Sequence, residues 1–495
     1  MAEAAWTSLG LLFSWPYILY PIAGTLLSML FAALPGVSGA TLMALAMPLV
    51  YSMEPTEALL LFGAFVGGGT FMGSVSAILV GIPGKDSNAA TVLDGYPMAQ
   101  QGLAKTAIGC SAAASALGST LGVAALLALL PYLREAVLLF GPTEFLALGL
   151  WGITTVALAA QGSWIRGFGA AALGFLLTLI GVDPRSGETR FTFGSLYLHD
   201  GLDFVLIFLG VFSLAEVIGL LTLGRRTISG KDRLEELRGS VWDGVRAVFA
   251  NFRLFVQSSS VGAAVGMIPG VGGMIAGFAA YGLAVRTVSD GNFGNGDIRG
   301  VLAPEAANDA KDGGALAPAL VFGIPSDSGT AMLLVALTQM GVAPGRELLD
   351  QHLDYVFLLV VSLFFSNWLT SLLGLALVRP FAWLTVAPAR WLGLGLMALT
   401  IVGAFAYRRS VADLLVVSLF GLLGHYMKRY GWSRVALVAA LVLGPLIETN
   451  LLLSLRLHEL GRVSLLERPI TLLLAGLTAA SWCGIWAQSV RRRET

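Results

Sequence analysis

The amino-acid sequence predicts an all-α polytopic membrane protein with about a dozen transmembrane helices in two inverted repeats that contain broken or re-entrant helices. Composition is the first reason. Of 495 residues, 56% are hydrophobic and 12% are charged, about half of the ~25% that is usual in soluble chains. The other two reasons are a succession of apolar stretches and a helix-breaking pattern that occurs twice.

The apolar stretches are long enough to cross a bilayer. A spanning helix needs about 20 mainly apolar residues. Stretches of this kind occupy residues 8–32, 57–80, 106–130, 136–160, 165–181, 202–223, 254–284, 314–340, 353–378, 391–407, 411–427, 433–453 and 469–489. The expected environment is therefore the lipid bilayer, and a formal net charge of +0 gives no reason to expect a nucleic-acid partner.

Basic residues predict how the chain is divided and oriented. They gather in the connection at residues 225–253, and Arg491, Arg492 and Arg493 stand near the C-terminus. Because cytoplasmic loops are enriched in Lys and Arg, we expect both places on the cytoplasmic side of a bacterial inner membrane. The connection separates a first membrane half, residues 1–224, from a second, residues 254–495.

Four helix-breaking motifs form the repeat. They are Ala33-Leu-Pro-Gly-Val-Ser-Gly39 and Gly81-Ile-Pro-Gly84 in the first half, and Met267-Ile-Pro-Gly-Val-Gly-Gly273 and Gly323-Ile-Pro-Ser326 in the second. Gly36 and Gly270 are 234 residues apart, whereas Pro83 and Pro325 are 242 apart, so the second copy carries eight extra residues. The run at residues 289–297 is rich in turn formers and accounts for them.

These motifs predict a binding site inside the membrane. Hydrocarbon tolerates non-helical backbone only where it is packed in protein or lines a cavity, and paired breaks in two halves are typical of secondary transporters. A new helix N-terminus suits a carboxylate. The residues expected to contact such a substrate are Pro35, Gly36, Ser38, Gly39, Lys85, Ser87, Asn88, Thr91, Pro269, Gly270, Gly272, Gly273, Ser326, Ser328 and Thr330.

Two alternatives remain open for these residues. Small residues let membrane helices approach closely, so packing explains many single glycines equally well. Lys85 is the sharpest candidate ligand, since an ionisable group at membrane depth is a functional hypothesis by default. A surface ion pair with Asp86 is the competing explanation for Lys85.

A polar run at residues 304–314 leads into the apolar stretch at 314–340. One interpretation makes it part of a coupling-ion site for Na⁺ or H⁺. The ligands would then be Glu305, Asn308, Asp309 and Asp327. The other interpretation is a solvated helix start with acidic residues near a favourable dipole. Neither the histidines nor the two cysteines show a metal-binding pattern, so no resident metal or cofactor is expected.

Other function classes fit poorly. Gly84-Lys85-Asp86 lacks the Ser/Thr and the first glycine of a phosphate-binding loop, which argues against an ATP-driven pump. No combination of nucleophile, base or metal ligands indicates an enzyme.

Six runs resemble one known family. They are Leu34-Pro-Gly-Val-Ser-Gly-Ala-Thr41, Gly81-Ile-Pro-Gly84, Leu93-Asp-Gly-Tyr-Pro-Met-Ala99, Pro304-Glu-Ala-Ala-Asn308, Phe322-Gly-Ile-Pro325 and Leu443-Gly-Pro-Leu446. Over nearly the whole chain they resemble the TctA family, the large membrane subunit of tripartite tricarboxylate transporters. The Asp-Gly-Tyr-Pro-Met-Ala run is the most specific, because generic membrane composition does not explain it.

The resemblance implies uptake of a tricarboxylate or another organic acid, driven by a Na⁺ or H⁺ gradient. It also implies two partners, a small membrane subunit of the TctB type and a periplasmic solute-binding protein of the TctC type. The alternative is a self-sufficient ion-coupled carrier or antiporter. The chain departs from the family pattern at Lys85, Asp309 and Ser326, where a small residue, asparagine and glycine are usual, and at Phe71-Met-Gly73, so the substrate is less certain than the family.

Overall fold

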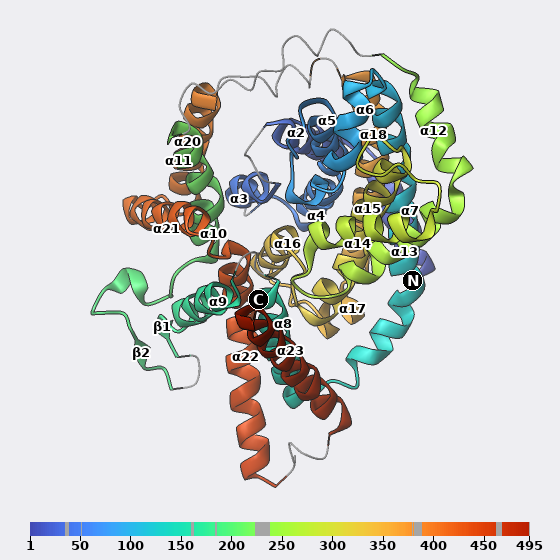
Figure 1. Ribbon diagram of the computed structural model, residues 1–495. Helices are drawn as coiled ribbons and strands as arrows, with labels where there is room; N and C mark the ends of the chain where they lie inside the picture. Colours follow the sequence, from blue (N-terminus) through green and yellow to red (C-terminus); the bar gives the residue numbers. More distant parts are fainter. Residues whose placement is uncertain are drawn as a thin grey trace.

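The chain is almost entirely helical (Figure 1). The computed structural model describes residues 1–34, 39–50, 52–159, 163–183, 186–222, 238–378, 380, 389–461 and 468–494. Within these ranges, one small antiparallel sheet pairs β1 (Gly181–Val182) with β2 (Thr189–Arg190), with Gly181 opposite Arg190. The predicted all-α class is confirmed.

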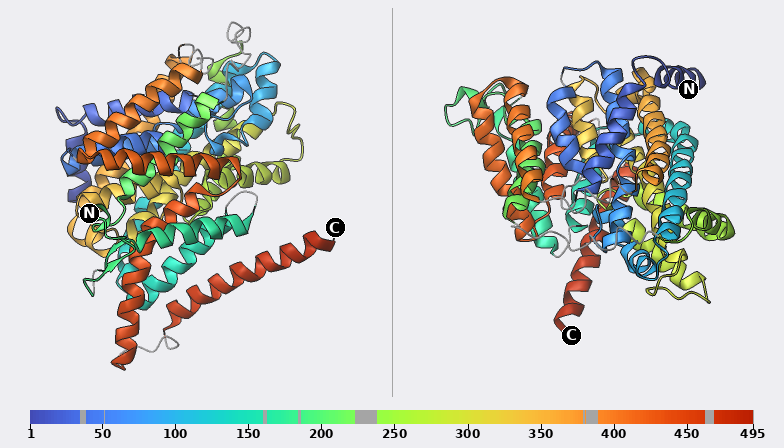
Figure 2. Two further views of the ribbon diagram at one scale, coloured as in Figure 1. Left: turned by 90° about the vertical axis from the view of Figure 1, so that its left-hand side faces the viewer. Right: turned by 90° about the horizontal axis from the view of Figure 1, so that it is seen from above.

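The described helices occur in the following order along the chain. Up to residue 222 they are α1 (Ala2–Leu12), α2 (Leu19–Ala33), α3 (Gly39–Val50), α4 (Pro55–Gly67), α5 (Thr70–Val80), η1 (Asp86–Asn88), α6 (Val92–Gln100), α7 (Ala104–Val137), α8 (Pro142–Leu158), α9 (Trp164–Thr178), η2 (Leu196–Leu198), α10 (Phe204–Phe208), the π-helical η3 (Leu209–Leu214) and α11 (Ala215–Thr222). From residue 238 on they are α12 (Val241–Ala250), α13 (Phe252–Gly266), α14 (Gly272–Thr287), α15 (Arg299–Phe322), α16 (Ser328–Gln339), α17 (Arg346–Gln351), α18 (Leu353–Ala376), α20 (Ala389–Arg408), α21 (Val411–Arg429), α22 (Arg434–Glu459) and α23 (Pro469–Glu494). Figure 2 shows α22 and α23 extending beyond the other helices.

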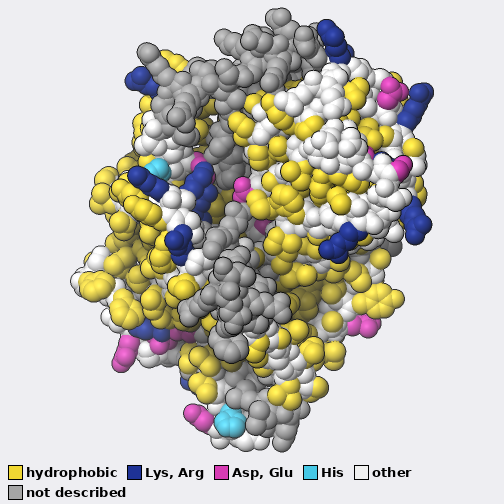
Figure 3. All heavy atoms as spheres, in the orientation of Figure 1, with side chains coloured by type: hydrophobic (Ala, Val, Ile, Leu, Met, Phe, Trp, Pro, Cys, Tyr) yellow, Lys and Arg dark blue, Asp and Glu magenta, His cyan; other side chains and the backbone are white. Residues whose placement is uncertain are grey.

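Many of these helices can cross a membrane. In the described part of the chain, seven are long and apolar enough: Pro55–Val80, Ala104–Val137, Phe204–Thr222, Leu353–Ala376, Arg390–Arg408, Val411–Arg429 and Arg434–Glu459. Shorter apolar helices stand beside them, and Figure 3 shows hydrophobic side chains over much of the visible surface, as lipid-facing helices require. The chain is thus a multi-pass membrane protein, while the total of about twelve spans and the inverted arrangement stay predictions.

The helix breaks before α3 and α14 lie at corresponding positions of the repeated sequence motif. α2 ends at Ala33 and α3 begins at Gly39, with residues 35–38 outside the described part. α13 ends at Gly266 and α14 begins at Gly272. A Pro-Gly pair stands in each interval of the sequence, and in the described break after α13, Pro269 cannot donate the backbone hydrogen bond that would continue the helix.

The two Gly-Ile-Pro motifs also end helices in the same way. α5 stops at Gly81 and α15 stops at Gly323, and these C-cap glycines have left-handed backbone with φ of 73° and 68°. Residues with a side chain are strained in this conformation. The glycine therefore ends the helix, and the proline two residues later prevents its continuation.

Helix α15 differs most from the sequence prediction. It begins at Arg299, about a turn before the polar run at residues 304–314, and that run lies fully buried inside the helix. The apolar stretch predicted from residue 314 therefore begins too late, because apolar composition alone does not include the polar run in the helix. α15 is surrounded by α7, α13 and α14, as Figure 1 shows. Gly262 and Gly266 of α13 face the α15 backbone at Ala307 and Lys311, so bare glycines make this burial possible.

Hydroxyl groups of α18 donate directly to the backbone of α4 and its C-cap. Three side chains spaced four residues apart on α18 donate to main-chain oxygens of α4 and its C-cap. The pairs are Ser362 to Leu60, Ser366 to Ala64 at 3.0 Å, and Thr370 to Gly68 at 2.9 Å. Each hydroxyl is buried with its hydrogen bond made, so this interface carries no polar cost in the membrane.

The loop between α14 and α15 contains the predicted insertion and is held by Asp94 of α6. Asp94 is fully buried. Its Oδ1 accepts hydrogen bonds from the backbone N–H groups of Gly294, Gly296 and Asp297 at 2.8, 2.9 and 2.9 Å, and its Oδ2 accepts one from the Tyr281 hydroxyl at 2.9 Å. One carboxylate of the first half thus fixes the fold of a loop in the second.

An ion pair stabilises the same loop. Arg299 contacts Asp297 and Asp290, each at 2.8 Å. Burial opposes ionisation of Asp297, but hydrogen bonds from the Arg299 side chain and backbone outweigh it and hold the pKa of Asp297 below its ordinary value. Asp297 therefore adds stability above the unfolded pKa of about 4, and this stability is lost as the pH falls through the lower folded pKa.

The basic connection at residues 225–253 is described from residue 238. Its described part contains the amphipathic helix α12, whose N-cap Ser240 accepts a hydrogen bond from the Asp243 backbone. α12 packs against α7 and leaves Trp242 and Phe249 exposed. Exposed aromatic residues on such a helix suit a membrane interface.

Candidate functional site

Segments that follow the helix breaks in one half contact segments that follow the helix breaks in the other half. α14, which follows the second-half break, packs against η1, which follows the first Gly-Ile-Pro motif, and α16 packs against α3 in the same manner. A Cβ atom on Gly273 would lie 2.7 Å from Ser87 Cβ and 3.0 Å from Asn308 Oδ1. A Cβ on Gly329 would lie 3.7 Å from Met43 Sδ. Predicted site residues from both halves therefore meet in one region.

Lys85 lies in the same region, and its ammonium group is unpaired among the described residues. Its side chain is half-buried, and among the described residues it makes no hydrogen bond or ion pair, including with Asp86. A Cβ on Gly39 would lie 3.7 Å from its Nζ, and one on Gly69 would lie 2.8 Å from it. The two bare glycines thus leave room for the ammonium group beside the start of α3. This geometry disfavours the surface pair with Asp86.

A second lysine, Lys311, is fully engaged. Its Nζ lies 2.6 Å from Asp312 Oδ1 and 3.1 Å from Asp327 Oδ2. Asp327 is also the N-cap of α16, since its Oδ1 accepts a hydrogen bond from the Thr330 backbone at 2.9 Å and its own N–H donates to Thr330 Oγ1 at 3.0 Å. These contacts fix the start of α16 after the second Gly-Ile-Pro motif.

Glu305 of α15 is surrounded by hydroxyl donors. Its Oε1 accepts from Ser74 at 2.7 Å and from Thr91, and its Oε2 accepts from Ser111 at 2.6 Å and Ser115 at 3.4 Å. Glu305 is completely buried. Donors from α5, α7 and the segment before α6 therefore supply the partners that a buried carboxylate requires.

Amide side chains extend the network. Asn88 donates to the Thr70 carbonyl at 3.1 Å and to Ser74 Oγ at 2.6 Å. With its amide oriented as its neighbours require, Asn367 of α18 donates to Asp309 Oδ1 at 2.8 Å. Asp309 thereby joins α15 to α18 through one of its two oxygens.

Several buried polar atoms in this region have no hydrogen-bond partner among the described residues. They are Asn88 Oδ1, Asn308 Nδ2, Asp309 Oδ2, Asp312 Oδ2 and Ser326 Oγ. An unsatisfied buried group costs about 1–3 kcal/mol, and such groups in a native protein call for an explanation. Binding of a polar solute or an ion in this region would supply the missing partners.

The remaining predicted contacts fall into three groups. Pro35, Gly36 and Ser38 lie outside the described residues. Gly270 packs tightly, since a Cβ there would overlap the backbone of Val156, and Pro269 beside it is buried. In the described part of the chain, no atom lies within 4 Å of a Cβ placed on Gly272, and Ser328 is half-buried at the start of α16.

The structure adds residues that the sequence analysis missed. They are Ser74, Ser111, Ser115, Lys311, Asp312 and Asn367. The spacing of Ser111, Ser115 and Ser119 at four-residue intervals in an apolar helix was an available signal for a polar face. Lys311 and Asp312 stand in the recognised polar run, but that run was assigned to the edge of a span.

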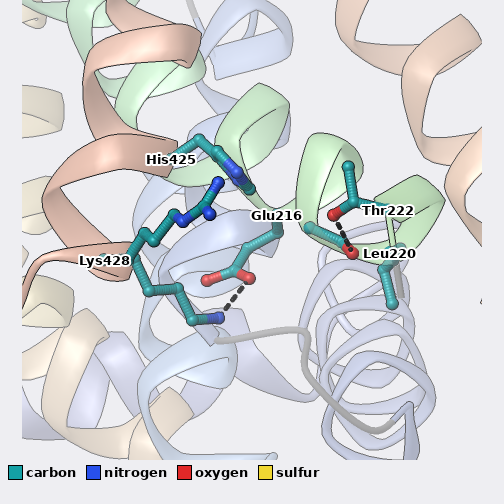
Figure 4. A pocket seen from close by; sticks show the side chains of 7 residues that line it. Glu216, Leu220, Thr222, His425 and Lys428 are labelled. Atoms are coloured by element: carbon teal, nitrogen blue, oxygen red, sulfur yellow. Dashed lines mark hydrogen bonds and ion pairs between the residues drawn. The ribbon is translucent and has the colours of Figure 1, made fainter.

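A separate pocket lies between α11 and α21 (Figure 4). Its lining residues are Glu216, Gly219, Leu220, Thr222, His425, Lys428 and Arg429. Lys428 and Arg434 contact the two oxygens of Glu216 at 2.6 and 2.9 Å. The lining shows no unpartnered buried polar atom in the described part of the chain, so the region around α15 is the stronger candidate for function.

Interrupted helices around buried charges, in a multi-pass membrane protein, are typical of solute transporters. The family model described as Tripartite tricarboxylate transporter TctA family matches residues 18–439. The chain belongs to this family and is a membrane component of a tricarboxylate-type transporter, which confirms the resemblance seen in the sequence.

Two proteins of Agrobacterium vitis are similar to this chain. An uncharacterized 52.8 kDa protein in the TAR-I ttuC′ 3′ region is 30% identical over 93% of this chain and 91% of its own length. An uncharacterized protein in the TAR-II ttuC′ 3′ region is 27% identical over 44% of this chain and 90% of its own length. No solved structure matches the chain.

Proposed function

We propose that this chain is the permease subunit of a binding-protein-dependent uptake system that carries a carboxylate across the bacterial inner membrane. A periplasmic protein of the TctC type delivers the substrate, and a small subunit of the TctB type completes the membrane part. A Na⁺ or H⁺ gradient supplies the energy. The observation that carries the proposal is Lys85, which lies beside the start of α3 and makes no hydrogen bond or ion pair within the described part of the chain.

The carboxylate binds between the two halves. Lys85 offers a charge-assisted hydrogen bond, and Gly39 and Gly272 leave space near the starts of α3 and α14. Ser326 Oγ is buried and has no hydrogen-bond partner among the residues that the structure describes, so it can donate to the same solute. The crosswise contacts of α3 with α16 and of α14 with η1 support the proposal that the halves are inverted repeats.

The coupling ion binds next to the substrate, on α15. Of the four predicted ligands, Glu305 already has its oxygens hydrogen-bonded and Asp327 is held by Lys311. Among the described residues, Asp309 keeps a carboxylate oxygen, Oδ2, without a partner, whereas the unpartnered atom of Asn308 is its amide Nδ2, a donor that cannot bind a cation. Asp309 is therefore better placed to bind the ion, with Glu305, Asn308 and Asp327 supporting the site around it.

The experiment uses right-side-out membrane vesicles that contain the chain and the small subunit but no ATP. Labelled organic acids are offered with and without the purified binding protein, under an imposed Na⁺ or pH gradient. We expect uptake of a carboxylate that needs both the binding protein and a gradient. Uptake without the binding protein would show the self-sufficient carrier instead, and no carboxylate uptake under either gradient would contradict the proposal.

A further inference from the structure

The pocket between α11 and α21 has a surplus of positive charge (Figure 4). Lys428 and Arg434 contact Glu216 at 2.6 and 2.9 Å, so two cations share one carboxylate and one positive charge is left over. Arg429 also lines the pocket, and it makes no hydrogen bond or ion pair among the described residues. These charges favour a negatively charged ligand.

The hydrogen-bond donors of the pocket suit a phosphate group. Lys428 donates to Glu216 at 2.6 Å, and within the described part of the chain its other N–H groups stay available to a ligand. Glu216 is 4% exposed and orients Lys428, whose own side chain is 51% exposed. Arg429 adds a planar fork of donors, which matches phosphate oxygens. The pocket volume of about 320 Å³ falls within the range of small-molecule sites.

The ends of the two helices place the pocket near a membrane surface. α11 ends at Thr222, shortly before the basic connection at residues 225–253 that we expect on the cytoplasmic side. At the neighbouring end of α21, Tyr426 and Tyr430 are exposed, and their stacked rings lie 6.2 Å apart. Tyrosines gather at the level of the lipid headgroups. We therefore expect the pocket at the level of the cytoplasmic headgroups.

An exposed apolar stripe runs along α21 toward the pocket. It consists of Leu415, Leu419 and Leu422, which stand about one helical turn apart and are all exposed. Leu422 is one turn from His425, which lines the pocket. A free phosphate ion gains nothing from this leucine stripe, whereas the acyl chains of a lipid can pack on it while the headgroup occupies the pocket.

We propose that the pocket between α11 and α21 binds the phosphate of an anionic phospholipid, with Lys428 and Arg429 as its ligands and the leucine stripe along its acyl chains. Basic pockets between transmembrane helices recognise such headgroups by charge-assisted hydrogen bonds. The site is separate from the Lys85 region. It does not depend on which solute the chain carries or on which ion drives transport.

The test is native mass spectrometry of the purified full chain in a neutral detergent, titrated with single lipids. The probes are phosphatidylglycerol and phosphatidylcholine with identical acyl chains. Both carry the same phosphate, but choline cancels the charge of the second headgroup. We expect phosphatidylglycerol to bind at least about fivefold more tightly, which is the effect of one basic residue near a lipid headgroup. Equal binding of the two lipids would overturn the proposal.

The decisive variant is Arg429→Ala, because Arg429 is exposed and its loss breaks no contact among the described residues. It should weaken phosphatidylglycerol binding about fivefold and leave phosphatidylcholine binding nearly unchanged. Lys428→Ala should act in the same direction, since Arg434 still neutralises Glu216. Unchanged phosphatidylglycerol binding in both variants contradicts the assignment of the pocket.

The matched control is Arg246→Ala on α12, whose side chain is 80% exposed and lies outside the pocket lining. A neutral micelle has no charged surface that would attract Arg246, so this variant should bind phosphatidylglycerol like the wild type. A loss as large as that of Arg429→Ala would show a general attraction of surface charges and would count against a specific pocket.

A soluble phosphate ester is the competing source of the same chemistry. Glycerol 3-phosphate at millimolar concentration is therefore added to the chain before the lipid titration. We expect phosphatidylglycerol binding to persist, because the soluble ester lacks the acyl chains that pack on the leucine stripe. Complete displacement of the lipid by glycerol 3-phosphate would assign the pocket to a soluble ligand and would overturn the lipid proposal.

Discussion

Replacing Asp94 by alanine is expected to destabilise the protein by at least about 3 kcal/mol, because three backbone N–H groups and a tyrosine hydroxyl lose the carboxylate that accepts their hydrogen bonds. The loss is large because Asp94 is fully buried, so water cannot replace it easily. We expect a sharp fall in the melting temperature of the detergent-solubilised chain and a lower yield of monodisperse protein.

Two further variants define the cause of this effect. Asp94→Asn keeps an acceptor oxygen but loses the charge, so it should lie between the wild type and Asp94→Ala. Asp243→Asn on α12 removes an exposed carboxylate and should change stability by less than about 0.5 kcal/mol. An Asp94→Ala protein that melts with the wild type would show that the loop between α14 and α15 does not depend on Asp94.

Replacing Glu305 by alanine is expected to cost about 3–5 kcal/mol, since it removes the acceptor shared by four buried hydroxyls from three segments. The hydroxyls of Ser74, Ser111 and Ser115 would lose this buried acceptor at the centre of the fold. The measurement is again the melting temperature, together with the dependence of uptake on the external ion.

Glu305→Gln separates support of the fold from a role in ion coupling. It keeps the length of the side chain and an oxygen acceptor, and the hydroxyls can rotate to meet the amide. We expect a milder loss of stability with ion-dependent uptake retained. A Glu305→Gln protein of native stability that has lost its ion dependence would instead make Glu305 a direct ligand of the coupling ion.

Much of this architecture could be predicted because it follows from local chemistry. The Gly-Ile-Pro motifs end α5 and α15 through Gly81 and Gly323, whose left-handed backbone is accessible to glycine at little cost. The insertion at residues 289–297 was recognisable from its turn-forming residues. It forms the loop whose backbone N–H groups donate hydrogen bonds to Asp94. The paired helix ends at Gly81 and Gly323 were visible as a motif that occurs once in each half.

The sequence was less informative about burial and side-chain partners, because these depend on packing between helices that are distant in the sequence. The polar run in α15 was indistinguishable from a solvated helix start, because its burial depends on glycines of α7 and α13 that are distant in sequence. Asn88 and Thr91 were assigned to the substrate, yet their side chains donate to Ser74 and Glu305. Lys311 forms an ion pair with Asp327 because α15 lies beside the start of α16. The sequence alone does not show how these two segments are placed.

The central claim is that Lys85 receives a carboxylate between the two broken segments. The most direct measurement is the half-saturating substrate concentration for uptake by the complete system, compared for wild type, Lys85→Ala, Lys85→Arg and the exposed control Arg246→Ala. A charge-assisted contact is worth about 1.5–3 kcal/mol, so Lys85→Ala should raise this concentration about ten- to a hundredfold, and Lys85→Arg should have a smaller effect because the two cations differ in shape. Arg246 is 80% exposed on α12, and its replacement should leave the concentration unchanged. A Lys85→Ala value within about a factor of two of the wild type would match a weak surface contact and would contradict the claim.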